Sequence, residues 1–139
     1  MLTVMALDPG NSTGWVCRAN TASFAETLYG GTVEADHEKV WRLLNTYNPD
    51  IVVYETFQMY PNKAQKLIWN SFYPCEVIGV IKLWVMLHGA QLVGLQPSVK
   101  KFALGESDDW HEVVRLGGPA TEHMRDAYRL LRYYERNKG

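Results

Sequence analysis

The sequence predicts a single α/β domain, residues 1–139, with a mixed central sheet flanked by helices. Two apolar runs, 3–7 and 51–54, lack any alternation of polar and apolar residues, which is typical of strands buried on both faces. From about residue 34 onward, helical patterns alternate with strand patterns, as parallel strands joined by helices require. No linker or repeat divides the chain, and 139 residues is the size of one compact domain.

Periodicity and turn residues define the expected elements in chain order. Five strands are expected, at 3–7, 14–17, 23–33, 51–54 and 90–95. The longer helices are expected at 34–47, 62–88 and 121–135, with a further one opened by Pro97. The helix at 34–47 is well marked, because Val40, Leu44 and Tyr47 repeat at helical spacing.

Glycine and proline predict where these elements are irregular. Gly30 and Gly31 predict a bulge or bend within the third strand. Pro74 predicts a kink or break in the long helix, because proline cannot donate a helical hydrogen bond. Residues 105–119 predict a short helix followed by a mobile loop.

Composition narrows the class of protein. Hydrophobic residues make up 47% and charged residues 21%, as in an ordinary soluble protein, and no apolar stretch is suited to spanning a membrane. Cys17 and Cys75 form neither a disulfide framework nor a zinc motif, so we expect a reducing, cytoplasmic location. Residues 1–55 hold three basic and seven acidic residues, whereas residues 56–139 hold eleven and eight. The basic excess is compatible with a phosphate-binding face, although solvated surface charge is the better explanation of the charge distribution taken alone.

Two of the buried strands end in a carboxylate. Asp8 closes the first apolar run, and Glu55 closes the run at 51–54. If these strands pair in parallel, neighbouring backbones lie about 4.8 Å apart and the two carboxylates converge. Such a pair is costly unless a cation lies between the acids, and oxygen ligands suit Mg²⁺ or Mn²⁺. Each acid taken alone is also consistent with a simple surface position at a strand end.

The last predicted helix carries a third acid. Asp126 and His123 are three residues apart and therefore share one helical face. Glu122, four residues before Asp126, fits the same face, and spacing does not choose between His123 and Glu122. Ala127, Leu130 and Leu131 supply the apolar stripe that would press this helix onto the sheet.

Together these residues resemble the RuvC class of Holliday-junction resolvases, and the chain looks most like a short phage-type member. The resemblance rests on Asp8-Pro9-Gly10 with Gly14 after a buried strand, on Glu55 at a strand end, and on His123-x-x-Asp126. It implies an RNase H-like fold in which Asp8, Glu55 and Asp126 bind two Mg²⁺ ions, with Mn²⁺ able to substitute. It also makes His123 a candidate metal ligand or proton carrier.

The resemblance extends to candidate DNA-binding residues. Pro97-Ser98-Val99-Lys100-Lys101 is similar to a family segment that places a lysine near the scissile DNA, and it does not rank Lys100 against Lys101. The stretch after Glu55, with Lys63 at its end, resembles a loop that inserts an aromatic residue at the junction centre. Phe57 and Tyr60 both fit that role, and core packing explains either one equally well.

The implied function is metal-dependent resolution of four-way DNA junctions, leaving 5′-phosphate and 3′-hydroxyl ends, in a bacterium or a phage-infected cell. A homodimer is expected, because a junction has two symmetric cut points and the apolar residues at 62–88 exceed one helix face. Two alternatives remain open. One is an RNase H-type nuclease for other branched or hybrid nucleic acid; the other is an ATPase-like phosphate-binding domain, suggested by the glycine-containing turn after Asp8.

Overall fold

A six-stranded mixed sheet forms the centre of the molecule in the computed structural model, which describes residues 2–20, 26–34, 36–56, 73–99, 112–116 and 121–137. The strand order is β5-β4-β1-β2-β3-β6. The strands are β1 (Val4–Asp8), β2 (Ser12–Asn20), β3 (Glu26–Glu34), β4 (Ile51–Glu55), β5 (Gln91–Leu95) and β6 (Val114–Leu116). β1 pairs antiparallel with β2 and parallel with β4, so the sheet is mixed, as the sequence predicts.

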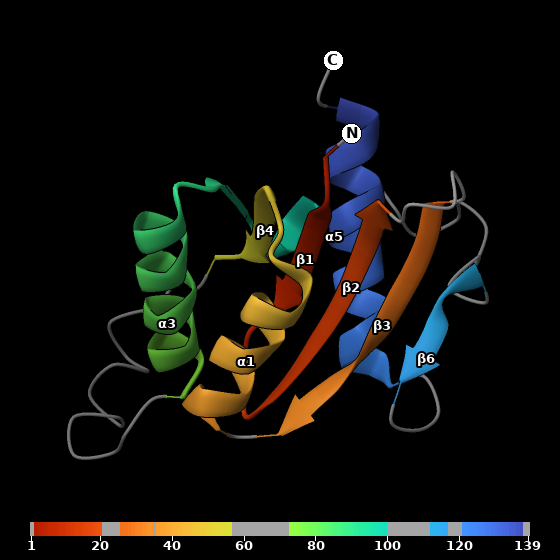
Figure 1. Cartoon of the computed structure of the whole chain (residues 1–139). Helices are drawn as coiled ribbons and strands as arrows, with labels where there is room; N and C mark the ends of the chain where they lie inside the picture. The colour runs from red at the N-terminus through yellow and green to blue at the C-terminus, as the bar shows by residue number, and fades with distance from the viewer. Residues whose placement is uncertain are drawn as a thin grey trace.

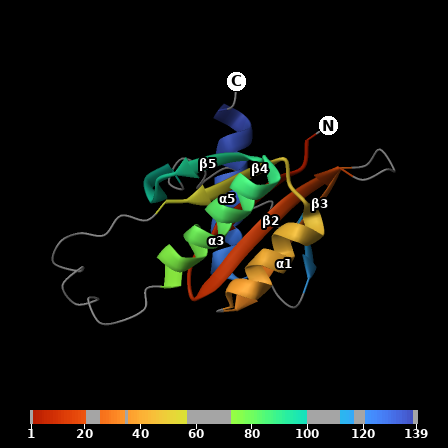
Figure 2. The ribbon, with the colours of Figure 1, turned by 60° about the vertical axis from the view of Figure 1, so that its left-hand side comes forward.

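Helices cover both faces of this sheet (Figures 1 and 2). The helical elements are α1 (His37–Tyr47), α3 (Tyr73–His88), the short 3₁₀ helix η2 (Pro97–Val99) and α5 (Glu122–Asn137). α1 and α3 pack on one face, and α5 crosses the other (Figure 1). The chain is therefore a three-layer α/β/α domain, which confirms the predicted fold class.

The alternation of side chains along β1 and β4 divides the core into two parts. Met5, Leu7 and Val52 face α1 and α3, whereas Ala6 and Val53 face α5. Each strand is apolar on both faces because each face is covered by helix, and this explains the unbroken apolar runs in the sequence. The same alternation decides which way the residues that end these strands point.

α1 shows how local signals define a helix. The Asp36 carboxylate caps its first turn by accepting hydrogen bonds from the backbone nitrogens of Glu38 and Lys39. At the other end Asn48 has a φ of 45° and donates its N–H to the Leu44 carbonyl, which closes the helix. The helix begins at His37 and not at residue 34, because β3 continues to Glu34.

One predicted irregularity is wrong, and two are only partly covered by the described residues. β3 pairs with β2 in continuous register through Gly30 and Gly31, so there is no bulge. α3 begins at Tyr73, so Pro74 lies in its first turn, where its missing N–H costs nothing, and the residues directly before it are outside the described part of the chain. Of the segment 105–119 the structure describes residues 112–116, which hold the strand β6, so most of the predicted short helix and loop lies outside the described residues. Of the predicted helix at 62–88, only residues 73–88 lie within the described residues.

β6 was missed because its formation depends on the partner strand. A side chain at Gly31 would approach the Leu116 carbonyl oxygen to 2.7 Å, and one at Gly30 would approach Val113 to 2.6 Å. The two glycines therefore let residues 113–116 lie close against β3. This need for space is a tertiary requirement that the composition of 105–119 does not reveal.

Both cysteines are free thiols, in agreement with the absence of a predicted disulfide framework. Cys17 is buried in the core, and burial raises the pKa of its thiol to about 12, so it stays protonated. Cys75 is exposed on α3. Among the described residues no helix is both long and apolar enough to cross a membrane.

Candidate active site

Asp8 and Glu55 end neighbouring parallel strands. Leu7 pairs with Tyr54 in the β1–β4 register, so Asp8 and Glu55 occupy the next position on each strand. Two-residue alternation places both acids on the same face as Ala6 and Val53, the face covered by α5. The side chain of Asp8 is only 12% exposed, and Glu55 is half-buried. The parallel pairing expected from the sequence is thus confirmed.

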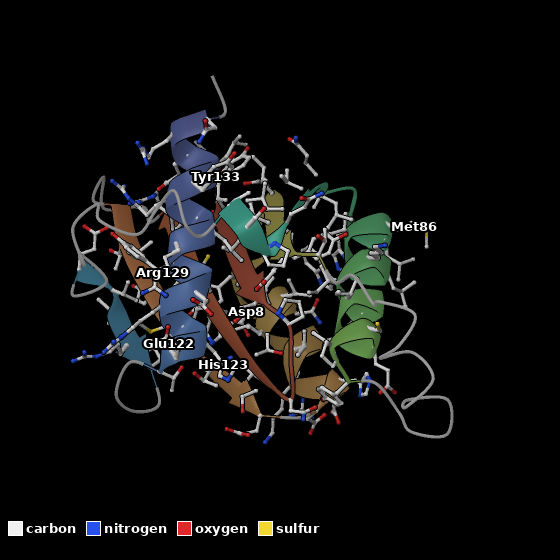
Figure 3. All side chains as sticks on the ribbon, turned by 180° about the vertical axis from the view of Figure 1, so that it is seen from behind. Asp8, Met86, Glu122, His123, Arg129 and Tyr133 are labelled. Carbon is white, nitrogen blue, oxygen red and sulfur yellow. The ribbon has the colours of Figure 1, made fainter. Side chains whose placement is uncertain are left out.

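His123 lies in the first turn of α5, the helix that covers this face of the sheet, and its side chain reaches Asp8. Its Nδ1 lies 3.5 Å from Oδ2 of Asp8, and its side chain is half exposed (Figure 3). Two residues earlier, Thr121 caps the helix by accepting a hydrogen bond from the Met124 nitrogen at 3.1 Å. The Thr121 hydroxyl also contacts the Thr32 hydroxyl on β3 at 2.6 Å. The helix cap and the contact between Thr121 and Thr32 therefore fix the position of His123 relative to the sheet.

A single glycine allows α5 to approach the sheet so closely. Gly14 on β2 pairs with Asp8. A Cβ atom at Gly14 would lie 2.5 Å from the Met124 nitrogen and closer still to the carbonyl group of His123. The backbone of His123 consequently rests directly on the strand beside Asp8, at a separation that only glycine permits.

The turn that follows Asp8 is closed by Thr13. The Thr13 hydroxyl donates to the Gly10 carbonyl at 3.2 Å and accepts from the Gly10 nitrogen at 3.3 Å. The Thr13 side chain is buried, so these bonds are sheltered from water. The loop between β1 and β2 thereby holds the end of β1, and with it Asp8, in place.

Asp126 and Glu122, both on α5, share one arginine. Nη1 of Arg129 lies 2.7 Å from Oδ1 of Asp126 and 3.2 Å from Oε1 of Glu122. Figure 3 shows Arg129 and Glu122 on α5. Burial alone would lower the Arg129 pKa, but the hydrogen bonds to Glu122 and Asp126 raise it above its usual value, so Arg129 is always charged. Of the two residues that spacing left open, His123 contacts Asp8, and Glu122 contacts Arg129.

The donor chemistry of this site suits a hard divalent cation. Carboxylate oxygens at the ends of β1 and β4, with an imidazole beside them, are ligands that Mg²⁺ and Mn²⁺ accept. Within the described ranges, however, no three acidic, histidine or cysteine side chains are close enough to hold an ion as they stand. Asp126 is engaged with Arg129. The types of donor present therefore fit such a cation, but they are not gathered around one point in the described residues.

Five residues predicted to bind DNA lie outside the described part of the chain. They are Phe57, Tyr60, Lys63, Lys100 and Lys101. The contacts of two residues of the site were missed in the sequence. The sequence did carry a signal for Arg129, because it lies three residues after Asp126, which is the spacing of an ion pair within a helix. Gly14 was noted as part of a motif, but its close contact with α5 has no signal in the sequence.

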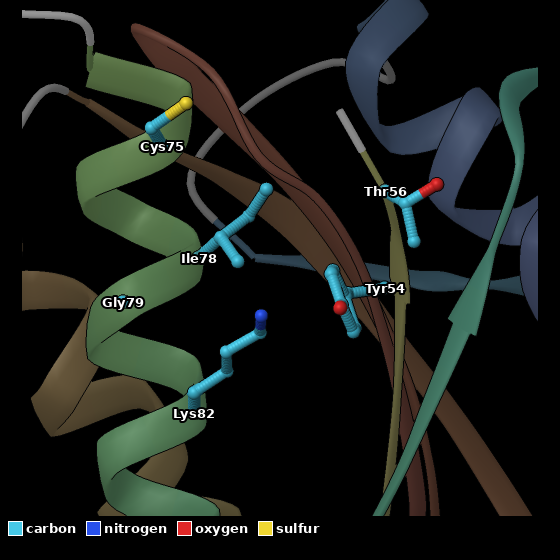
Figure 4. A pocket seen from close by; sticks show the side chains of 6 residues that line it. All are labelled: Tyr54, Thr56, Cys75, Ile78, Gly79 and Lys82. Carbon is cyan, nitrogen blue, oxygen red and sulfur yellow. The ribbon is translucent and has the colours of Figure 1, made fainter. Parts of the chain in front are cut away.

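A separate cavity of about 420 Å³ opens on the opposite face of β4 (Figure 4). Its lining comes from the end of β4 and from α3, namely Tyr54, Thr56, Cys75, Ile78, Gly79 and Lys82. Tyr54 and Thr56 flank Glu55 in the chain, and alternation points them toward α3 and away from α5. The cavity is therefore distinct from the carboxylate site.

No protein-family model and no curated protein sequence matches the chain. Solved structures do match. Thermus thermophilus RuvC in complex with a Holliday junction substrate is 19% identical, with a TM-score of 0.63, and the match covers 97% of this chain and 96% of that one. The Fowlpox virus resolvase bound to Holliday junction DNA is 16% identical, with a TM-score of 0.63 and coverage of 96% and 99%. The yeast mitochondrial resolvase Ydc2 is 10% identical, with a TM-score of 0.50 and coverage of 96% and 77%.

These matches span almost the whole of the chain, and two of the three also span nearly the whole of the matched protein. The TM-scores of 0.63 over this coverage indicate the same overall architecture. The expectation of an RNase H-like architecture is therefore confirmed. The chain has the RNase H-like fold of the RuvC and poxvirus Holliday junction resolvases.

Proposed function

We propose that this protein is a nuclease that resolves four-way DNA junctions by metal-dependent hydrolysis of phosphodiester bonds, leaving 5′-phosphate and 3′-hydroxyl ends. The observation that carries the proposal is the placement of Asp8 and Glu55 side by side at the ends of β1 and β4, with His123 on Asp8. The fold supports it, because neighbours of the same architecture were solved with Holliday junction DNA.

We further propose that Mg²⁺ is the cofactor, with two ions in the site and Mn²⁺ as a substitute. Asp8, Glu55 and Asp126 would hold the ions, with His123 as a further ligand or proton carrier. Bound ions of this kind supply an activated water and stabilise charge on the leaving oxygen. Asp8 is suited to a central role because its carboxylate is nearly buried on a rigid strand, and Glu55 is positioned by the adjacent strand.

The DNA contacts stay predictions. We propose that Lys100 or Lys101 offsets phosphate charge near the cleaved bond and that Lys63 binds the backbone. Phe57 or Tyr60 would stack on bases left unpaired at the centre of the junction, a contact worth about 1–3 kcal/mol per base in other proteins.

The proposal is tested by offering the purified protein labelled four-way junctions, forks, flaps, linear duplex and RNA–DNA hybrid, with Mg²⁺, with Mn²⁺ and with EDTA. We expect paired symmetric nicks in the four-way junction in Mg²⁺ or Mn²⁺, no cleavage in EDTA, and products that a DNA ligase reseals. Religation requires the 5′-phosphate and 3′-hydroxyl ends. Preferred cleavage of the hybrid or of flaps would instead favour the alternative nuclease, and metal-independent cleavage would contradict the proposed chemistry.

We propose that the protein acts as a homodimer that uses α3. Leu83, Met86 and Leu87 expose 47%, 71% and 63% of their surface on this helix, and Met86 points away from the fold (Figure 3). Large apolar side chains in such a group are typical of an association surface. Two copies would also place two sites on a substrate that has two equivalent cut points.

Light scattering at micromolar concentration is expected to give a mass twice the 15.9 kDa of one chain. Leu87→Glu should reduce the mass to that of a monomer, because it would bury a charge at the interface without touching the core. Leu2→Glu is the matched control, since Leu2 is similarly exposed at 60% but lies far from α3 in the chain, before β1. A wild-type protein that stays monomeric contradicts the dimer.

A further inference from the structure

One nitrogen of Arg129 connects two acids that lie one helical turn apart on α5. Nη1 contacts Asp126 at 2.7 Å and Glu122 at 3.2 Å. The environments of the two acids differ, because the side chain of Asp126 is 19% exposed and that of Glu122 is 67% exposed. Arg129 itself is 20% exposed, so it stands between an inner carboxylate and an outer, solvated one.

This arrangement determines the state of the site without a cation. Asp126 is one turn along the helix from His123, which itself lies on Asp8. In the described part of the chain, Asp8 is thus within reach of His123, and Asp126 is bonded to Arg129. α5 provides both of these partners. The positive charge of Arg129 offsets the negative charge of Asp126.

We propose that Arg129 is a positioning residue that holds Asp126 in the metal-free protein and passes to Glu122 when Asp126 turns toward a divalent cation. The inference rests on the proposed function, since it takes Asp126 to be a metal ligand. Glu122 makes the exchange feasible, because Arg129 keeps a charged partner at the same nitrogen after Asp126 leaves. An arginine left partly buried without a partner would oppose the exchange. Arg129 therefore sets how tightly the site binds its cation.

The test measures Mg²⁺ binding to the full chain by titration calorimetry and by the Mg²⁺ dependence of the melting temperature, without DNA. Arg129→Met is expected to melt lower than wild type in EDTA and to bind Mg²⁺ roughly five-fold more tightly, the order expected when a weak ion pair no longer competes. Arg132→Met is the matched control. It is an arginine on the same helix, 3.6 Å from Glu135, and its removal should leave Mg²⁺ affinity unchanged.

Two double-mutant cycles separate exchange from a general effect of charge. In an Asp126→Asn background, Arg129→Met should no longer change Mg²⁺ affinity, because the competition acts through Asp126. Glu122→Gln should weaken Mg²⁺ binding roughly two-fold in wild type and have no effect in Arg129→Met. If Glu122 were itself a metal ligand, its loss would weaken binding in both backgrounds. Glu122 is exposed, so this variant gives a result even if Arg129→Met does not fold.

Unchanged or weaker Mg²⁺ binding in Arg129→Met would overturn the inference, as would tightening of equal size in Arg132→Met or in the Asp126→Asn background. A wild-type protein without saturable Mg²⁺ binding would overturn it as well. The proposed function fails separately: a protein that shows the expected Arg129 effects but cuts no branched DNA contradicts the nuclease and leaves the exchange standing. A protein that cuts junctions while Arg129→Met binds Mg²⁺ as wild type does contradicts only the exchange.

Discussion

Asp8→Asn is expected to lower the rate of junction cleavage in Mg²⁺ by about 10³-fold or more. The substitution keeps the shape of the side chain but removes the charge from the most enclosed carboxylate of the site, 12% exposed at the end of β1. Loss of a charged group that organises metal-assisted hydrolysis removes several kcal/mol of transition-state stabilisation, and about 1.4 kcal/mol corresponds to a factor of ten in rate. Single-turnover cleavage of a labelled junction measures the effect.

The variant should still bind the junction in a gel-shift experiment, because most of the affinity comes from contacts with the phosphate backbone. Asp50→Asn is the matched control. Asp50 accepts a hydrogen bond from the Thr3 nitrogen next to the other end of β1, so the same chemical change is made far from the site. If Asp8→Asn cleaves within a few-fold of the wild-type rate, Asp8 is not part of the catalytic site.

The contact between His123 and Asp8 extends this expectation to a second side chain. His123→Ala should slow cleavage strongly, and His123→Asp should recover part of the rate, because an acid at this position also offers a ligand or a proton carrier. Because the His123 side chain is half exposed, we expect both variants to keep the stability of the wild type, and the melting temperature of each variant checks this. Equal rates in the wild type and both variants would show that His123 takes no part in cleavage. Glu122 would then be the candidate for this role.

Among the glycines in the described residues, Gly14 is the one where replacement by alanine is expected to have the largest effect. The added carbon would overlap the carbonyl group of His123 and approach the Met124 nitrogen to 2.5 Å, and both belong to backbone that is capped by Thr121 and packed on the sheet. The first turn of α5 has to move away from β2. We expect a loss of about 1–3 kcal/mol in the free energy of unfolding, as for other overpacked sites.

Displacement of α5 should also separate His123 from Asp8, so cleavage should fall further than the loss of stability alone explains. Gly79→Ala is the matched control, because a Cβ atom at Gly79 on α3 meets nothing within 4 Å. Replacing a mid-helix glycine there should stabilise the protein by about 0.5–1 kcal/mol and leave cleavage unchanged. Thermal unfolding followed by circular dichroism measures both variants. A Gly14→Ala protein as stable and active as wild type contradicts the close packing of α5.

The elements that the sequence predicted well are those with strong local signals. The apolar runs at β1 and β4, the amphipathic pattern of α5 and the end of α1 at residue 47 can each be recognised from a short stretch of sequence, without knowledge of the distant residues that pack against it. The predictions that failed concerned Gly30, Gly31 and β6. A glycine in a strand is compatible with a bulge or with a close approach by another element, and only the position of β6 distinguishes the two.

For the candidate site, the sequence alone determined which acids end buried strands and which residues share the face of the last helix. Asp8, Glu55 and Asp126, with either His123 or Glu122 beside Asp126, follow from strand ends and from helical periodicity, both of which are local properties. The ion pair between Asp126 and Arg129 is local as well, because the two residues lie three apart on α5. The contact between His123 and Asp8 was decided only in the tertiary structure, since it requires Gly14 to admit the backbone of α5. Such contacts depend on distances between elements far apart in the chain, and the periodicity of a single element carries no information about those distances.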